Sequence, residues 1–471
     1  MGQEIETSQF SNYDFSTFSR NLEQETKLLA ELFRNDRFAN DKIIGGFEIE
    51  AWLVSSSGAA SPVNQTFLSQ LNNPMVVHEL AAFNVELNSV PVEMKQKALS
   101  NMENQLQETW NECRHVAKEL SINMMLIGIL PSIQQQQLTM ANMSKLNRYR
   151  ALNEQVIKLR DGRPLQLDIS GKESIRTSHH DVMLESACTS LQLHIQVPVD
   201  KAARFYNASI MLSAPMVAVA ANSPYLFGYE LWDETRIPLF EQSVELGSDD
   251  YRRVTFGHAY IKHSMFECFE ENLKHYPVLV PFKESSDITQ LSHLCFHNGT
   301  IWRWNRPLIG FDENGIVHLR IEHRVIPSGP TVTDSIANAA FYFGLVHTLA
   351  EEIDDFEERL PFHNAKDNFY SCAKHGLSTS IDWPEFGKIS VKTLLIETLI
   401  PAARRGLLNL DIAQNDIDKY LSIIERRTES EQNGANWQRN WVTRHGRDMN
   451  RLTCSYLERQ NHGSPVHEWT I

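Results

Sequence analysis

The chain has 471 residues, 42% of them hydrophobic, which is enough for a large core and would permit two or three domains. Its 44 Lys and Arg against 59 Asp and Glu give a net charge of −15, which would repel a phosphate backbone, so we expect no nucleic-acid partner. The N-terminus lacks the apolar core of a secretion signal, and the longest apolar run, 210–221, is too short to cross a bilayer.

Six scattered cysteines, with no Cys-x-x-Cys, argue against disulfides and structural zinc. We therefore expect a cytoplasmic protein with reduced thiols and no membrane partner, and the sequence leaves its oligomeric state open. No repeat or long linker divides the chain. The predicted organisation is a polar N-terminal arm (1–15), one catalytic domain (16–430) and a C-terminal helical and coil extension packed on that domain (431–471).

Helices are predicted where apolar residues recur every three or four positions. One such stripe runs through 97–122, and a Pro-interrupted apolar helix is expected over 202–221. Thr331 and Asp334 resemble a capping box that opens another helix.

Four short segments instead alternate apolar and polar residues, which is typical of β-strands: 46–52, 85–88, 191–197 and 317–325. In the first of them Phe47, Ile49 and Ala51 share one face, while Glu48 and Glu50 share the other.

The polar faces of the four strands have an unusual composition, with many acids, histidine and arginine and almost no lysine. The residues that stand out are Glu48, Glu50, Glu86, His194, Arg320, Glu322 and Arg324. Each strand alone fits a sheet with one face in water. If all four share one sheet, however, their carboxylates converge and repel each other unless cations neutralise them. Oxygen-rich ligation with one imidazole favours Mg²⁺ or Mn²⁺ over zinc, and the arginines would complete a phosphate clamp.

The familiar nucleotide loops and nucleophile motifs are missing from the sequence. Gly171-Lys172-Glu173 matches only the end of a P-loop, and no G-x-G-x-x-G follows a strand. No G-x-S-x-G occurs either, so a serine triad is not indicated. A nucleotide would have to bind through metal and arginine.

Short motifs in a fixed order cover the chain from about 45 to 350, namely 46–50, 78–88, 128–131, 190–195, 221–224, 301–307 and 318–325. In these motifs the chain resembles the glutamate–cysteine ligase superfamily, in the bacterial and plant-like branch that includes carboxylate–amine ligases. The resemblance implies an α+β fold similar to the catalytic domain of glutamine synthetase. In such a fold a curved, mainly antiparallel sheet forms an active-site funnel, helices cover its outer face, and ATP is a co-substrate.

The resemblance also assigns residues to roles. It implies metal ligands at Glu48, Glu50, Glu86, Glu93, His194 and Glu322. Arg324 and Arg306 match residues that hold the transferred phosphoryl group or the substrate carboxylate, and Arg320 and Gln192 are expected to bind the nucleotide. Gln192 departs from the pattern, because many relatives have a small residue there.

The predicted function is an Mg²⁺-dependent ligase that forms a γ-glutamyl amide from glutamate, cysteine and ATP through a γ-glutamyl phosphate. One alternative is a carboxylate–amine ligase that uses another amine. A second is a phosphotransferase similar to guanidino kinases, which share the general fold. A third is a non-catalytic binding protein, against which the many clustered acids argue.

Overall fold

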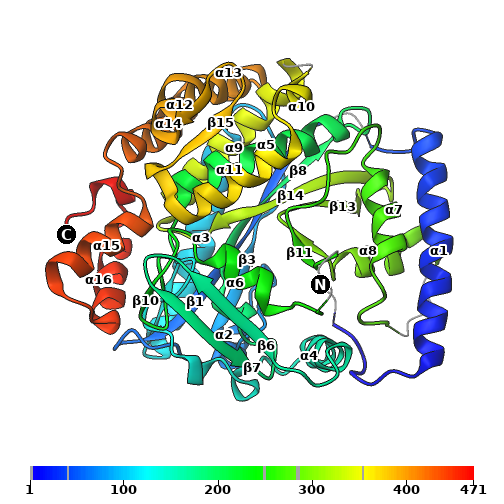
Figure 1. The fold of residues 1–471 in the computed structure, drawn as a ribbon, viewed down its shortest axis with the longest axis horizontal. Helices are drawn as coiled ribbons and strands as arrows, with labels where there is room; N and C mark the ends of the chain where they lie inside the picture. Colours follow the sequence, from blue (N-terminus) through cyan, green and yellow to red (C-terminus); the bar gives the residue numbers. More distant parts are fainter. Residues whose placement is uncertain (1–3, 40–41, 248–250, 283–286, 353–354) are drawn as a thin grey trace.

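The computed structural model describes residues 4–39, 42–247, 251–282, 287–352 and 355–471. This part of the chain folds around a curled antiparallel sheet (Figure 1). Its strand order is β13-β14-β8-β1-β3-β2, and β4 and β5 also pair with β1. The strands are β1 (Ile44–Ser55), β2 (Val76–His78), β3 (Asn84–Asn88), β4 (Val92–Glu93), β5 (Ile122–Met125), β8 (Ser190–Val197), β13 (Asn305–Phe311) and β14 (Val317–Pro327). The predicted α+β class and all four predicted strands are confirmed.

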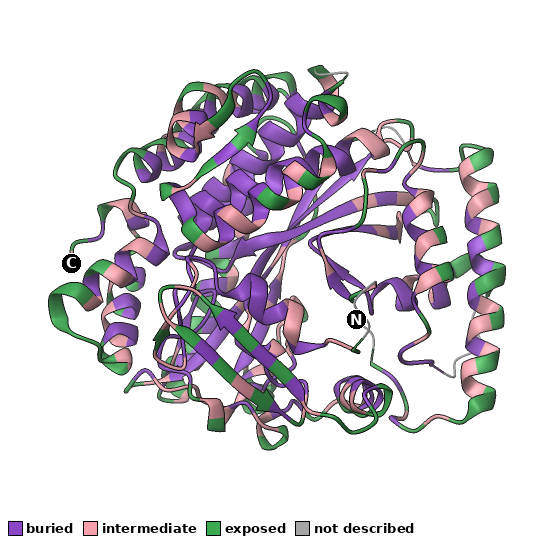
Figure 2. Cartoon of the chain, viewed as in Figure 1, coloured by how far each residue is buried: buried purple, intermediate pink, exposed green. Residues whose placement is uncertain are grey.

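Helices cover the apolar face of the sheet. They are α3 (Ala98–Glu119), α5 (Ala202–Ala220, with Pro215 inside) and α9 (Val332–Glu352), which match the three predicted helices. A Cβ added at Gly45 of β1 would meet Met102 of α3 and Phe343 of α9, so these helices pack on the face that Phe47 and Ile49 share. Figure 2 shows the sheet and the helices α5 and α9 as largely buried. The opposite face of the strands carries the acids and lines the cavity described below.

The remaining helices surround this centre. They are α1 (Asn12–Arg34), α2 (Asn64–Leu71), α4 (Asn147–Leu159), α6 (Arg236–Ser243), α7 (Phe266–His275), α8 (Ser292–Asn298), α10 (Phe356–Arg359), α11 (Phe362–His375), α12 (Val391–Leu394), α13 (Ile400–Asn409), α14 (Gln414–Glu429), α15 (Gly434–His445) and α16 (Met449–His462). The first turn of α1 falls within the segment 1–15 that was expected to be a polar arm. Two-stranded sheets complete the described fold: β6 (Leu165–Ser170) with β7 (Ser174–His179), β9 (Tyr225–Leu226) with β10 (Tyr229–Glu230), β11 (Val254–Thr255) with β12 (Trp302–Arg303), and β15 (Ser380–Trp383) with β16 (Gly387–Ser390). Within the described residues, the helices all fall short of the length or apolar content that a bilayer crossing requires.

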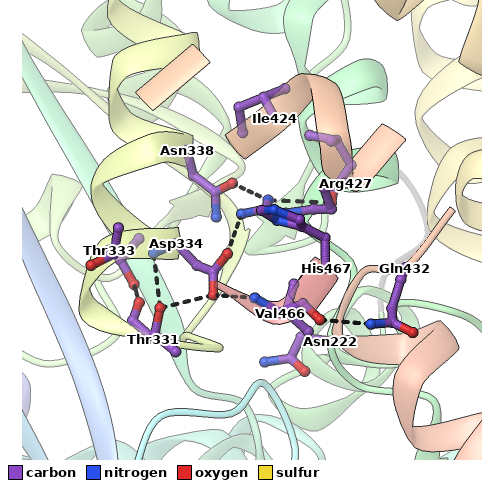
Figure 3. A network of polar contacts seen from close by, with 12 residues as sticks. Asn222, Thr331, Thr333, Asp334, Asn338, Ile424, Arg427, Gln432, Val466 and His467 are labelled. Carbon is purple, nitrogen blue, oxygen red and sulfur yellow. Dashed lines mark hydrogen bonds and ion pairs between the residues drawn. The ribbon is translucent and has the colours of Figure 1, made fainter. Parts of the chain in front are cut away.

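A buried polar network ties the C-terminal segment to α9 (Figure 3). The guanidinium group of Arg427 in α14 donates to Asp334 at 2.8 Å and to Asn338 at 2.6 Å, both in α9. The other oxygen of Asp334 accepts a hydrogen bond from the backbone N–H of Val466 at 3.0 Å. Because Arg427 and Asp334 are both buried, each charge depends on the other for compensation. The last residues of the chain are therefore held against the core.

Candidate active site

Strand register aligns the polar side chains of the sheet in rows across the strands. Arg306 of β13 lies opposite Glu322 of β14, which in turn lies opposite His194 of β8. Residues opposite one another in antiparallel strands have Cβ atoms about 5 Å apart, so their side chains interact directly. The first row therefore places an arginine, a glutamate and a histidine side by side.

Two further rows cross β1. In one, Glu48 lies between Gln192 of β8 and Asn88 of β3. In the next, Glu50 lies opposite Glu86 of β3. Two carboxylates in directly opposed positions repel each other unless one is protonated or a cation lies between them.

These rows line a cavity of about 940 Å³. Of the residues predicted from the sequence, the cavity lining contains Glu48, Glu50, Glu86, Gln192, His194, Arg306, Arg320, Glu322 and Arg324. The four strands with acidic faces thus line one cavity. If these faces were simply solvated, their side chains would have no reason to converge.

A cluster of three carboxylates occupies one part of the cavity. Oxygens of Glu50, Glu79 and Glu86 all lie within 4.8 Å of one another. Burial, followed by repulsion from the neighbouring carboxylates, raises the pKa of Glu50 and of Glu79 to about 8 and raises the pKa of Glu86 well above its usual value. These shifts favour the protonated form of the three carboxyl groups, and a divalent cation bound among them would replace the protons.

A second group of donors forms around His194. Its Nε2 lies 3.5 Å from a carboxylate oxygen of Glu48, and neither ring nitrogen has a hydrogen-bond partner among the described residues. Burial lowers the pKa of His194, so the ring is neutral and keeps a lone pair. A buried, neutral imidazole without a hydrogen bond, beside a carboxylate, has the chemistry of a metal ligand.

The three arginines of the cavity differ in how they are bound. Arg306 and Arg324 each donate to a different oxygen of Glu322, both at 2.6 Å. Although burial raises the pKa of Glu322, the two guanidinium groups hold it well below its usual range. Arg324 also donates to Gln192 at 2.7 Å, whose amide in turn donates to Glu50 at 2.9 Å. The side chain of Arg320, by contrast, makes no hydrogen bond or ion pair with another described residue, and its Nε is buried without a partner, so its charge is available to an anionic ligand.

Comparison with known proteins identifies the family of the chain. The family model "Glutamate-cysteine ligase family 2" matches residues 44–463. The chain belongs to this family. The resemblance found in the sequence motifs is thereby confirmed over most of the chain. Comparison with curated protein sequences gives no match.

Solved structures of ligases have the same fold. The chain is similar to the crystal structure of a glutamate–cysteine ligase from Francisella tularensis in complex with AMP, with a TM-score of 0.54 and 11% identity over 92% of this chain and 90% of that one. It is also similar to a bifunctional glutathione synthetase from Pasteurella multocida, with a TM-score of 0.54 and 11% identity over 93% of this chain and 54% of that one. Family and fold together support an ATP-dependent carboxylate–amine ligase.

One predicted ligand of the family pattern, Glu93, lies away from the others. It pairs with Ile44 of β1, four residues from Glu48, which is about 13 Å along a strand. Its carboxylate, 34% exposed, instead lies 2.9 Å from Lys95 and 3.5 Å from Lys42. A hydrogen bond from Lys95 lowers its pKa, as expected for a paired surface acid. Glu93 is absent from the cavity lining.

Two acids of the cavity were not predicted as site residues. Glu79 follows β2 in the connection to β3, and Glu185 lies in a short 3₁₀ turn before β8. Burial raises the pKa of Glu185 to about 7. Neither residue is part of an alternating strand, so periodicity could not reveal them. The only signal for Glu79 was its place inside the motif 78–88.

Proposed function

We propose that this protein is an Mg²⁺-dependent ligase that joins the γ-carboxylate of glutamate to the amine of cysteine, using ATP. The observation that carries the proposal is the convergence of six carboxyl groups, a neutral buried histidine and an unpaired arginine in one cavity. Membership of Glutamate-cysteine ligase family 2 supports the substrates.

The donor set fits Mg²⁺ or Mn²⁺, because it is rich in oxygen and contains one imidazole. Glu50, Glu79 and Glu86 would hold one ion, and Glu48, His194 and Glu322 would hold a second. We leave Glu93 out of this set because of its pairing with lysines. When bound, the ions would neutralise the negative charge of the nucleotide phosphates.

The three arginines of the cavity would bind different anionic groups of the substrates. Arg320, whose side chain has no hydrogen-bond partner among the described residues, is suited to bind a phosphate of ATP. Arg324 and Arg306, fixed in direction by Glu322, would hold the transferred phosphoryl group or the carboxylate that receives it. Gln192 links Arg324 to Glu50 and so joins the clamp to the metal-binding group.

The reaction requires activation of a carboxylate, which is a poor acylating agent. Transfer of the γ-phosphoryl group of ATP to the γ-carboxylate of glutamate gives an acyl phosphate and ADP. Attack of the amine on the acyl carbon then forms the amide and releases inorganic phosphate. Water would hydrolyse the intermediate, so the reaction needs a site enclosed by protein, and the walls of the cavity would provide it.

The direct test is an assay of the purified protein with Mg²⁺, ATP and glutamate against a panel of amines that includes cysteine. We expect ADP, inorganic phosphate and γ-glutamylcysteine in equal amounts, no reaction after chelation, and recovery when Mg²⁺ is restored. An amide with a different amine would keep the mechanism and change the acceptor. Accumulation of a stable phosphorylated product, with no release of phosphate, would instead indicate a phosphotransferase.

A second expectation concerns pH and Mg²⁺. Because the pKa values of Glu50 and Glu79 are raised to about 8 in the fold, the folded protein binds more protons than the unfolded chain between about pH 4.5 and 8. Without metal, the stability should therefore fall as pH rises through this window. Mg²⁺ must displace these protons, so the increase in Tm that it causes should be larger at pH 8.5 than at pH 6. Differential scanning fluorimetry with and without Mg²⁺ checks this, and an equal increase in Tm at both pH values would contradict it.

A further inference from the structure

The motif 221–224, which the proposed function does not use, supports a buried ion pair beside the cavity. The backbone N–H of Asn222 donates to Glu234 at 2.8 Å, and Ser223 Oγ accepts the backbone N–H of Arg236 at 3.2 Å. Glu234 in turn accepts a hydrogen bond from Arg236 Nε at 3.1 Å. Glu234 is 0% exposed and Arg236 is 2% exposed, so the motif fixes this guanidinium group in the protein interior.

The guanidinium group of Arg236 reaches an irregularity in β14. In the pairing of β14 with β8, the register shifts between His323 and Ile326, where β14 has one extra residue. Such a bulge takes backbone groups out of the ladder, and buried carbonyls without a partner are costly. Arg236 satisfies two of them, because Nη1 donates to the carbonyl of Arg324 at 3.2 Å and Nη2 donates to the carbonyl of Val325.

This bulge contains Arg324, the residue proposed to bind the phosphoryl group or the substrate carboxylate. A bulge changes the direction of the side chains that it carries, and Arg324 here reaches both Glu322 and Gln192 in the cavity. We infer that Arg236 is a positioning residue, which holds the bulge of β14 so that Arg324 points at the anionic group of the substrate. Arg236 also lines the cavity, but its Nε, Nη1 and Nη2 are all bound to acceptors of the protein, so it acts through Arg324. The inference rests on the proposed role of Arg324.

A double-mutant cycle tests this coupling. The affinity for a non-hydrolysable ATP analogue with Mg²⁺ is measured by calorimetry for Arg236→Lys, Arg324→Lys and the double variant. Lysine keeps the positive charge beside Glu234 but cannot donate to two carbonyls as a planar fork does. We expect each single change to weaken binding about tenfold, the usual effect of losing one charge-assisted hydrogen bond. The double variant should bind within about twofold of Arg324→Lys alone, because the two residues act as one unit.

Arg427→Lys is the matched control. It changes a buried arginine that also donates to two acceptors, but in the network between α14 and α9, so its effect should be the same with either residue at position 324. Glu234→Gln keeps the shape of the group that orients Arg236 and gives a second cycle with the same expected coupling if Arg236→Lys is unstable. The inference is overturned if Arg236→Lys weakens binding equally in both backgrounds, or if either single change leaves the affinity unchanged. Failure of the proposed function would appear separately, as absence of amide formation by the unchanged protein.

Discussion

Replacing Glu50 by Gln is expected to reduce turnover by on the order of 10³-fold without unfolding the protein. Glu50 lies opposite Glu86 in the sheet, and its oxygen is within 4.8 Å of oxygens of Glu79 and Glu86. The change removes one negative charge from a group that must bind a divalent cation, while the size and shape of the side chain stay the same. The affinity for Mg²⁺ should fall together with turnover.

The measurements are kcat in the ligase assay, circular dichroism for the fold, and the increase in Tm that Mg²⁺ causes. Glu93→Gln is the matched control, because it removes the same charge from an acid that the sequence also predicted as a ligand but that lies outside the cavity lining. We expect turnover and Mg²⁺ response to be unchanged in Glu93→Gln. Normal turnover in Glu50→Gln would contradict the metal assignment, and a large loss in Glu93→Gln would return that residue to the site.

Replacing Arg324 by Lys is expected to lower kcat by on the order of 10²-fold. Nε of Arg324 is bound to Glu322 at 2.6 Å and Nη2 to Gln192 at 2.7 Å, so the remaining N–H groups keep a fixed direction. A lysine has three N–H donors on one nitrogen, so it cannot reproduce the planar fork by which Arg324 reaches Glu322, Gln192 and a phosphoryl group in different directions. The positive charge beside Glu322 is retained, so the protein should still fold.

Kinetics at saturating ATP and glutamate separate this loss of kcat from a loss of binding. Arg427→Lys, far along the chain in the buried network of Figure 3, should lower Tm while the folded protein keeps its kcat. A fully active Arg324→Lys enzyme would show that this arginine has only a structural role.

The sequence by itself determined which side chains share a strand face. Alternation with period two placed Glu48 and Glu50 opposite Phe47 and Ile49, and the structure keeps that division because a strand has only two faces. The helices over 97–122 and 202–221 followed for a similar local reason, since the apolar stripe of the first and the largely apolar composition of the second must be buried. The ordered motifs indicated the family, and the family resemblance in turn implied the roles of the residues.

Only the tertiary structure decided which of these residues meet. Glu86 lies opposite Glu50, and His194 opposite Glu322, because strands far apart in the sequence pair in one particular register, which no local pattern specifies. Glu79 joins the carboxylates from a connection between strands, so its position depends on the path of the chain and not on periodicity. Glu93 looked equivalent to the other acids, but it lies in β4 opposite Ile44, four residues before Glu48 in β1, and its carboxylate is beside lysines instead. The sequence identified most of the donors, but not Glu79, and the distances between them depend on how the strands of the sheet pair.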